Sequence, residues 1–153
     1  MLKIRIEMDE NVSEEIIIKC NSLSDEVLRL QQLLTDAIGK PEHLILYKGN
    51  TEYYLELNDI LFFETESSVV MAHTAKETYE TSYKLYELED LLPGRFLRVS
   101  KGAIVNTSKI YSINRNLTSS SAIEFSGTYK TIYVSRGYYK SLKEKLEEMR
   151  YRK

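Results

Sequence analysis

The chain has 153 residues with 42% hydrophobic content, which is enough for one ordinary domain with a real core. No apolar run approaches the roughly 20 residues that cross a bilayer, and we expect no export signal because acidic residues interrupt the first apolar alternation. One cysteine, Cys20, excludes an intramolecular disulfide and a cysteine-based metal cluster, so a cytoplasmic location is expected.

The net charge of -2 conceals a charge split along the chain. Residues 95–153 hold thirteen Lys or Arg against four Asp or Glu, whereas residues 1–94 hold eight against nineteen. A basic C-terminal part can meet phosphates while the acidic remainder faces away from them. The alternative is a solvated surface whose asymmetry arose by chance.

The first 42 residues predict a strand, a second strand and a helix. Apolar residues alternate with charged ones over residues 2–8, and residues 16–18 form a β-branched run, so two paired strands are expected. Residues 23–38 have helical apolar spacing, with Ser24 placed to cap the helix and Gly39 placed to end it. The apolar stripe of this helix either covers the two strands or forms a dimer face.

A boundary is expected at residue 42, after which the pattern is mostly β. A short helix is predicted over residues 84–92, before Pro93-Gly94, and a longer one from Arg136 to about Met149. The sequence therefore predicts an α+β protein, mainly β. The expected strands cover residues 44–47, 53–57, 60–64, 69–73, 79–83, 103–105, 109–113, 122–125 and 131–134.

Residues able to perform catalysis are sparse. His43 and His73 are the two imidazoles, and neither lies in a recognisable motif. Glu64 and Glu66 can share one face of a strand, as a catalytic or metal-binding pair does, but no third carboxylate has a matching spacing, and surface ion pairs are the favoured interpretation. No glycine-rich phosphate loop is present. We therefore expect no enzyme, no cofactor and no metal.

Two basic residues lie at turns. Lys101 and Gly102 precede a β-branched strand, and Arg136 follows Ser135 where a strand passes into a helix. The helix dipole disfavours a cation in the first turn by about 0.3–1 kcal/mol, which an anionic partner would offset. Arginine can also donate two parallel hydrogen bonds to guanine in a major groove. These residues indicate DNA binding, although an exposed arginine paired with a carboxylate is the simpler alternative.

Residues 44–146 resemble the LytTR DNA-binding domain of bacterial response regulators and stand-alone transcription factors. The resemblance rests on the order and spacing of Ile60-Leu61-Phe62-Phe63-Glu64, Tyr83-Lys84-Leu85-Tyr86-Glu87-Leu88-Glu89-Asp90-Leu91-Leu92, Phe96-Leu97-Arg98-Val99-Ser100-Lys101, Ile104-Val105-Asn106 and Val134-Ser135-Arg136. It implies an elongated β-β-β fold with small helices, whose loops enter successive major grooves and bend the DNA.

By position, the resemblance implies base contacts from three places. These are the loop at Ser67 and Ser68, the turn at Ser100 and Lys101, and Arg136. The middle motif of the family commonly reads His-Arg-Ser, from which Ser100-Lys101-Gly102 departs. Asn106 is expected to tie a turn together. Residues expected to contact phosphates are Arg98, Lys109, Arg115, Lys130 and Lys140.

The expected partner is double-stranded DNA, read at repeated sites by a homodimer, with no small-molecule substrate. The resemblance also allows a membrane-protein antagonist. The expected organisation is an N-terminal element over residues 1–42, serving dimerisation or covering the core, and a LytTR-like domain over residues 43–153, without the receiver domain that usually precedes it. The competing hypothesis is a protein-protein interaction module with a charge-segregated surface and no DNA function.

Overall fold

The computed structural model describes residues 3–39 and 41–150. The chain forms two compact units, residues 1–35 and residues 36–153. The division falls inside helix α1 (Asp25–Ala37), and so precedes the boundary predicted at residue 42. None of the helices in the described residues is long and apolar enough to span a membrane.

Helix α1 confirms the helix predicted near the N-terminus. The backbone N–H of Val27 donates to Ser24 Oγ at 3.2 Å, and that of Leu28 donates to the Ser24 carbonyl at 3.0 Å. Asp25 and Glu26 occupy the first turn, where the helix dipole favours negative charge. The predicted capping residue therefore starts the helix.

The two N-terminal strands were predicted wrongly. Residues 3–24 contain no strand, and Leu2, the first residue of the predicted alternation, lies outside the described residues. The side chains of Ile4 and Ile6 are 98% and 86% exposed. Alternation of apolar and charged residues specifies a strand only where a second layer covers the apolar face, and a two-stranded ribbon without such a layer is marginally stable.

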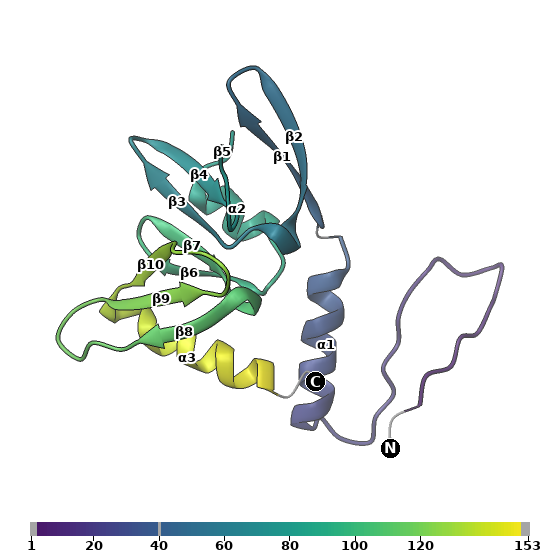
Figure 1. The fold of residues 1–153 in the computed structure, drawn as a ribbon. Helices are drawn as coiled ribbons and strands as arrows, with labels where there is room; N and C mark the ends of the chain where they lie inside the picture. The colour runs from purple at the N-terminus through teal and green to yellow at the C-terminus, as the bar shows by residue number, and fades with distance from the viewer. Residues whose placement is uncertain (1–2, 40, 151–153) are drawn as a thin grey trace. The chain divides into compact units, whose positions relative to one another are not determined.

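The second unit contains two antiparallel sheets within the described residues (Figure 1). The larger sheet has seven strands in the order β2-β1-β5-β4-β3-β7-β6, and the smaller has three in the order β10-β9-β8. This architecture confirms the predicted α+β class. The strands are β1 (His43–Lys48), β2 (Thr51–Glu56), β3 (Phe62–Glu66), β4 (Val69–His73), β5 (Thr78–Glu80), β6 (Phe96–Ser100), β7 (Ala103–Asn106), β8 (Ile110–Asn114), β9 (Ser121–Phe125) and β10 (Thr131–Val134).

Each face of the larger sheet is packed against a different cluster. Successive residues of a strand point to opposite faces of the sheet, so the neighbouring residues Phe62 and Phe63 of β3 lie on opposite faces. Phe63 lies with Phe96 and the fully buried Leu88 of helix α2 (Leu85–Leu91). Phe62 stacks on Phe125 of the smaller sheet, in the cluster that also holds Leu142 of helix α3 (Arg136–Met149). The sheet is thus held between α2 on one face and the smaller sheet with α3 on the other.

Both C-terminal helices confirm their predictions, and α3 has the predicted bounds. Strand β6 was not among the predicted strands, although its residues belong to one of the quoted motifs. It follows Pro93-Gly94 closely and carries Arg98 at a half-buried position, which hides the apolar alternation. Its pairing with β7 also shifts register between Arg98 and Ser100, so the strand departs from a regular ladder.

Candidate nucleic-acid interface

The turn between β3 and β4 holds two serines in an unusual backbone conformation. Ser67 and Ser68 have φ values of 51° and 71°, in the left-handed region that non-glycine residues rarely adopt. The pairing of Glu66 with Val69 makes this a two-residue hairpin turn, where Asn-Gly is the usual choice. Strain of this kind concentrates at functional sites. Both serines are exposed, as a base-contacting turn requires.

The turn between β6 and β7 displays Lys101. Ser100 pairs with Ala103 across it, and the Gly102 N–H donates to Ser100 Oγ at 3.2 Å. Arg98 lies beneath the turn, where its Nε donates to the Ser100 carbonyl at 2.8 Å and its Nη2 donates to the Lys101 carbonyl. These bonds hold the backbone of the turn while the Lys101 side chain stays exposed.

Arg136 is the first residue of α3 and is held close to β6. The Ser135 N–H donates to the Val99 carbonyl at 2.9 Å, and the Ser135 hydroxyl lies 3.4 Å from the same oxygen. Ser135 therefore opens the helix, as predicted, but its hydroxyl is directed to β6 and does not cap a helical N–H. Arg136 is exposed and makes no hydrogen bond or ion pair with any described residue.

Backbone bonds place the three predicted base-contacting segments next to one another. The Thr65 N–H donates to the Gly102 carbonyl at 2.9 Å, and Glu64 pairs with Ala103, so the β3–β4 turn adjoins the β6–β7 turn. Val99, which receives the Ser135 bond, directly precedes Ser100. Three segments therefore lie on adjoining elements. They are the β3–β4 turn with Ser67 and Ser68 (the serine turn), the β6–β7 turn with Lys101 (the Lys101 turn), and Arg136 at the start of α3. We call these segments the three-turn edge.

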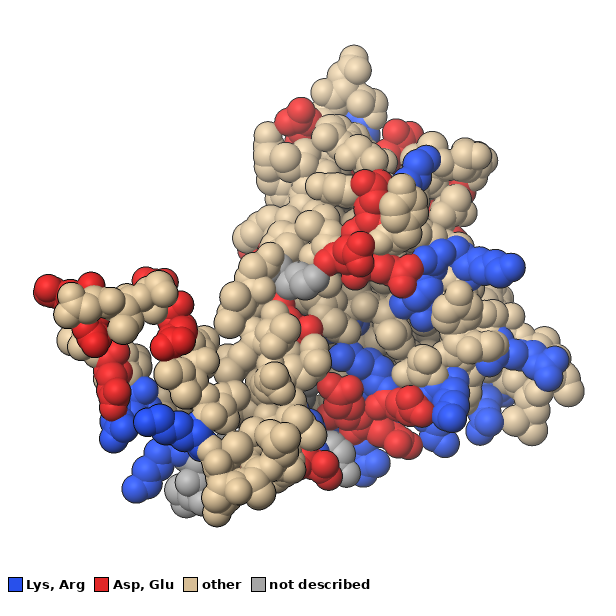
Figure 2. All heavy atoms as spheres, turned by 180° about the vertical axis from the view of Figure 1, so that it is seen from behind, with Lys and Arg blue, Asp and Glu red and all other residues tan. Residues whose placement is uncertain are grey.

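Positive charge accumulates on this side of the second unit. In Figure 2 its Lys and Arg side chains gather along the edge at the right of the view, which corresponds to the side toward which the β3–β4 turn and the β8–β9 loop point in Figure 1. Lys140 is exposed one helical turn after Arg136, and Arg115 is exposed with its guanidinium 4.7 Å from the centre of the Tyr139 ring. Lys109 is half-buried in the 3-10 turn Thr107–Lys109.

An open pocket of about 150 Å³ brings Arg115 beside Arg136. Asn116, Ser119 and Ser121 contribute polar groups to its lining. The prediction from sequence did not single out these three residues, although residues 116–121, which are polar except for Leu117 and follow Arg115, are a signal that could have identified them. Two guanidiniums beside amide and hydroxyl groups make a lining suited to anions such as DNA phosphate.

Two of the predicted phosphate-contacting cations are instead bonded within the unit. Arg98 supports the Lys101 turn and pairs with Glu89. Lys130 Nζ lies 2.6 Å from the Glu77 carbonyl, and 3.2 Å from both Thr78 Oγ1 and His73 Nδ1. Burial lowers the pKa of Lys130. A phosphate contact from either side chain would require these bonds to be exchanged.

Asn106 is fully buried and ties two segments together. Its Nδ2 donates to the Ile60 carbonyl at 3.0 Å, and its Oδ1 accepts from the N–H and the hydroxyl of Ser108. The Asn106 N–H also donates to the Leu61 carbonyl at 2.8 Å. These contacts position the end of β7 against the segment that leads into β3, and they leave no atom of Asn106 available to DNA.

The chain is similar to known proteins over most of its length. The family model of the LytTr DNA-binding domain matches residues 50–147. An uncharacterized HTH-type transcriptional regulator of Staphylococcus aureus strain NCTC 8325 is 29% identical over 147 residues, which cover 95% of this chain and 99% of that protein. A counterpart from strain MRSA252 is 28% identical over the same length.

A solved structure agrees in fold. It is the LytTr DNA-binding domain of a Bacillus cereus protein described as a methyl-accepting/DNA response regulator, with a TM-score of 0.63 at 20% sequence identity. The similarity covers 68% of this chain and 95% of that one. Since the family match covers well over half of the chain, including helix α3 as far as residue 147 and every strand of both sheets except β1, the chain belongs to the LytTr DNA-binding domain family.

Proposed function

We propose that this protein is a transcriptional regulator that reads double-stranded DNA in a sequence-specific manner through the three-turn edge. The observation that carries the proposal is the placement of the serine turn, the Lys101 turn and Arg136 on adjoining elements held by backbone hydrogen bonds. Arg136 and Lys101 are exposed, so they can reach base edges in a major groove. Arg115, Lys109 and Lys140 would contact phosphates and set the register.

A salt series on duplex binding tests this proposal. The logarithm of the binding constant for duplex DNA should fall steeply and linearly with the logarithm of salt concentration, because lysine and arginine release counterions from the phosphates they neutralise. A duplex selected from a random library should be preferred over random DNA at moderate salt. Equal affinity for both would favour the competing hypothesis of a protein-protein interaction module.

We propose further that two copies act on a repeated site, since joining two readers raises the effective local concentration of the second. Exposed apolar side chains in the N-terminal unit support a dimerisation role there, and Ile4, Ile6 and Met8 are each at least 86% exposed. In sedimentation equilibrium, wild-type protein should dimerise and the double variant Ile4→Asp, Ile6→Asp should be monomeric. Tyr111→Asp, at a 75% exposed position in the other unit, serves as the control and should dimerise. A dimeric double variant would rule out this role for the N-terminal unit.

A cytoplasmic location and a membrane-protein antagonist are further parts of the proposal that rest on the resemblance. Binding of duplex DNA requires access to the chromosome, which places a bacterial regulator in the cytoplasm. The family is defined by DNA binding and is not a class of enzymes.

A further inference from the structure

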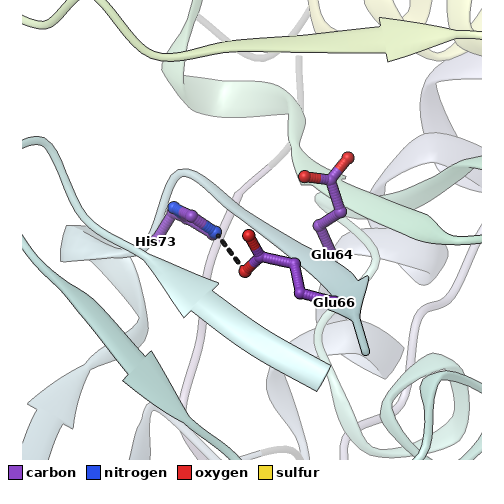
Figure 3. Close-up of side chains that lie close together, drawn as sticks. All are labelled: Glu64, Glu66 and His73. Carbon is purple, nitrogen blue, oxygen red and sulfur yellow. Dashed lines mark hydrogen bonds and ion pairs between the residues drawn. The ribbon is translucent and has the colours of Figure 1, made fainter. Parts of the chain in front are cut away.

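Three potential metal ligands meet on one face of the β3–β4 hairpin (Figure 3). Glu64 and Glu66 are two residues apart on β3 and therefore share a face. His73 pairs with Phe62 across the hairpin, which directs its imidazole to that same face. One ligand atom from each of the three residues lies within 4.8 Å of the other two.

The His73 ring is already held in a ligand-like orientation. It stacks on Phe62 with ring centres 4.4 Å apart, and Thr78 Oγ1 lies 3.3 Å from Nδ1. Nε2 faces the Glu66 carboxylate at 3.2 Å, as the dashed line in Figure 3 marks. Histidine ligands usually donate their second ring N–H to a nearby oxygen. Metal binding at Nε2 would place the ring proton on Nδ1, where it can donate a hydrogen bond to the Thr78 hydroxyl in place of the contact that Nδ1 makes with Lys130 Nζ.

The negative charge at this position is incompletely compensated. Glu64 is half-buried and makes no hydrogen bond or ion pair with the residues that the structure describes. Burial, together with the neighbouring Glu66 carboxylate, raises the pKa of Glu64. The nearby Glu77 carboxylate is paired with Lys48, so it does not supply a competing ligand. A dication between Glu64 and Glu66 would relieve their mutual repulsion.

Lys130 is the cation that faces this cluster, and its placement is compatible with a metal. Its Nζ lies 3.2 Å from Nδ1, on the opposite side of the ring from the metal-binding nitrogen Nε2, and on releasing Nδ1 it keeps the Glu77 carbonyl as an acceptor. Burial, and then the charge of Lys130, lower the pKa of His73. Both effects favour the neutral imidazole, which is the form that binds metal.

From this geometry we propose that Glu64, Glu66 and His73 form a binding site for a divalent transition-metal ion, with Zn²⁺ as the preferred occupant. An imidazole nitrogen with carboxylate oxygens is a donor set that Zn²⁺ accepts, and three protein ligands leave a fourth position for water. Metal–ligand bonds of about 2.0–2.2 Å require the three donors to approach more closely than 4.8 Å. Rotation of the two flexible glutamate side chains achieves this while the hairpin backbone stays in place.

Occupancy would act on the turn that carries Ser67 and Ser68. Glu66 is the last residue before this turn, so a bound ion would couple the two strands at its base and neutralise carboxylates close to it. We expect Zn²⁺ to raise the affinity for duplex DNA, because these carboxylates otherwise repel phosphate. This consequence rests on the proposed DNA-binding function, whereas metal binding itself does not.

Calorimetric titration of Zn²⁺ into the full-length chain, without DNA, tests the site. Cys20 is exposed, so every protein in the series carries Cys20→Ser to remove a thiol ligand. His43→Gln is the matched control, because His43 is the other imidazole and lies 3.9 Å from Glu56. The control should bind one equivalent of Zn²⁺ with the affinity of the parent protein. His73→Gln and Glu66→Gln should bind Zn²⁺ at least about tenfold more weakly.

Equal affinity in all four proteins, or no saturable binding to the parent protein, would overturn the site. Because His73→Gln removes a ring that packs on Phe62, Mn²⁺ broadening of amide resonances in the unsubstituted chain gives a second test that needs no variant. Broadening should centre on residues 62–73, and broadening centred elsewhere would also overturn the site. Duplex binding measured in EDTA reports on the DNA function separately, so failure of one proposal is distinguishable from failure of the other.

Discussion

Arg136→Ala should separate DNA affinity from protein stability. Arg136 is exposed, lacks a bond to any described residue, and stands at the positive end of the α3 dipole. Its removal should leave the free energy of unfolding unchanged or raise it by about 0.3–1 kcal/mol. If its guanidinium reads a guanine, affinity for the selected duplex should fall by about 1–3 kcal/mol, or about 5- to 150-fold.

The measurements are urea unfolding and fluorescence anisotropy with the selected duplex and a scrambled one. Lys84→Ala is the matched control, because Lys84 is an exposed cation at the start of α2, which packs in the Phe63 cluster, away from the smaller sheet and α3. It should give the same small gain in stability and no loss of affinity. Lys140→Ala should weaken both duplexes equally, as a phosphate contact does.

Two results would refute the assignment of Arg136. The first is an unchanged preference for the selected duplex over the scrambled one in Arg136→Ala. The second is a loss of stability large enough to account for the loss of binding, which would show that Arg136 supports the fold.

Three further predictions concern stability. Asn106→Ala should lower the free energy of unfolding in urea by about 2–4 kcal/mol, because it leaves buried partners unsatisfied, and a loss below 1 kcal/mol would contradict the hydrogen bonds described. Ser67→Gly and Ser68→Gly should each raise the free energy of unfolding by up to about 1 kcal/mol, since glycine adopts positive φ without strain. Both variants should also weaken duplex binding. A lower free energy of unfolding in either variant would argue against backbone strain at the serine turn. The lowered pKa of His73 means that the unfolded chain binds its proton more readily, so metal-free stability should fall as the pH drops below the ordinary value of 6.5. His73→Gln should remove that dependence and His43→Gln should not, and an equal slope in both would exclude His73 as its source.

Local chemistry made much of the fold predictable. Helix α3 was predicted with its bounds because its apolar stripe and the start after Ser135 coincide, and the α1 cap was predicted because Ser24 stands before acidic residues. The N-terminal strands were predicted wrongly because alternation in sequence carries no information on whether a covering layer exists. Strand β6 was missed because Arg98 interrupts its apolar pattern. The Arg98 side chain donates a hydrogen bond to the Ser100 carbonyl and so holds the turn between β6 and β7.

The candidate site was predictable only in part. The residue positions of the three-turn edge followed from the family resemblance, but their adjacency depends on pairing between β3, β7 and β6, which is not visible in sequence. The sequence could not show that Lys130, one of the residues expected to contact phosphate, is bonded to the Glu77 carbonyl beside His73, and its phosphate contact stays a prediction. The pair Glu64 and Glu66 lacked a third ligand in sequence, and cross-strand pairing supplies His73 from seven residues beyond Glu66.

Site selection from a random duplex library, performed in parallel with wild-type protein, Lys101→Ala, Arg136→Ala and Ser68→Gly, tests the three-turn edge most directly. Because the three segments adjoin one another but occupy different positions along the edge, each variant should lose preference at a different position of the selected sequence and keep it elsewhere. Selected sequences that are identical for all four proteins would contradict the assignment of this edge as the DNA-reading surface.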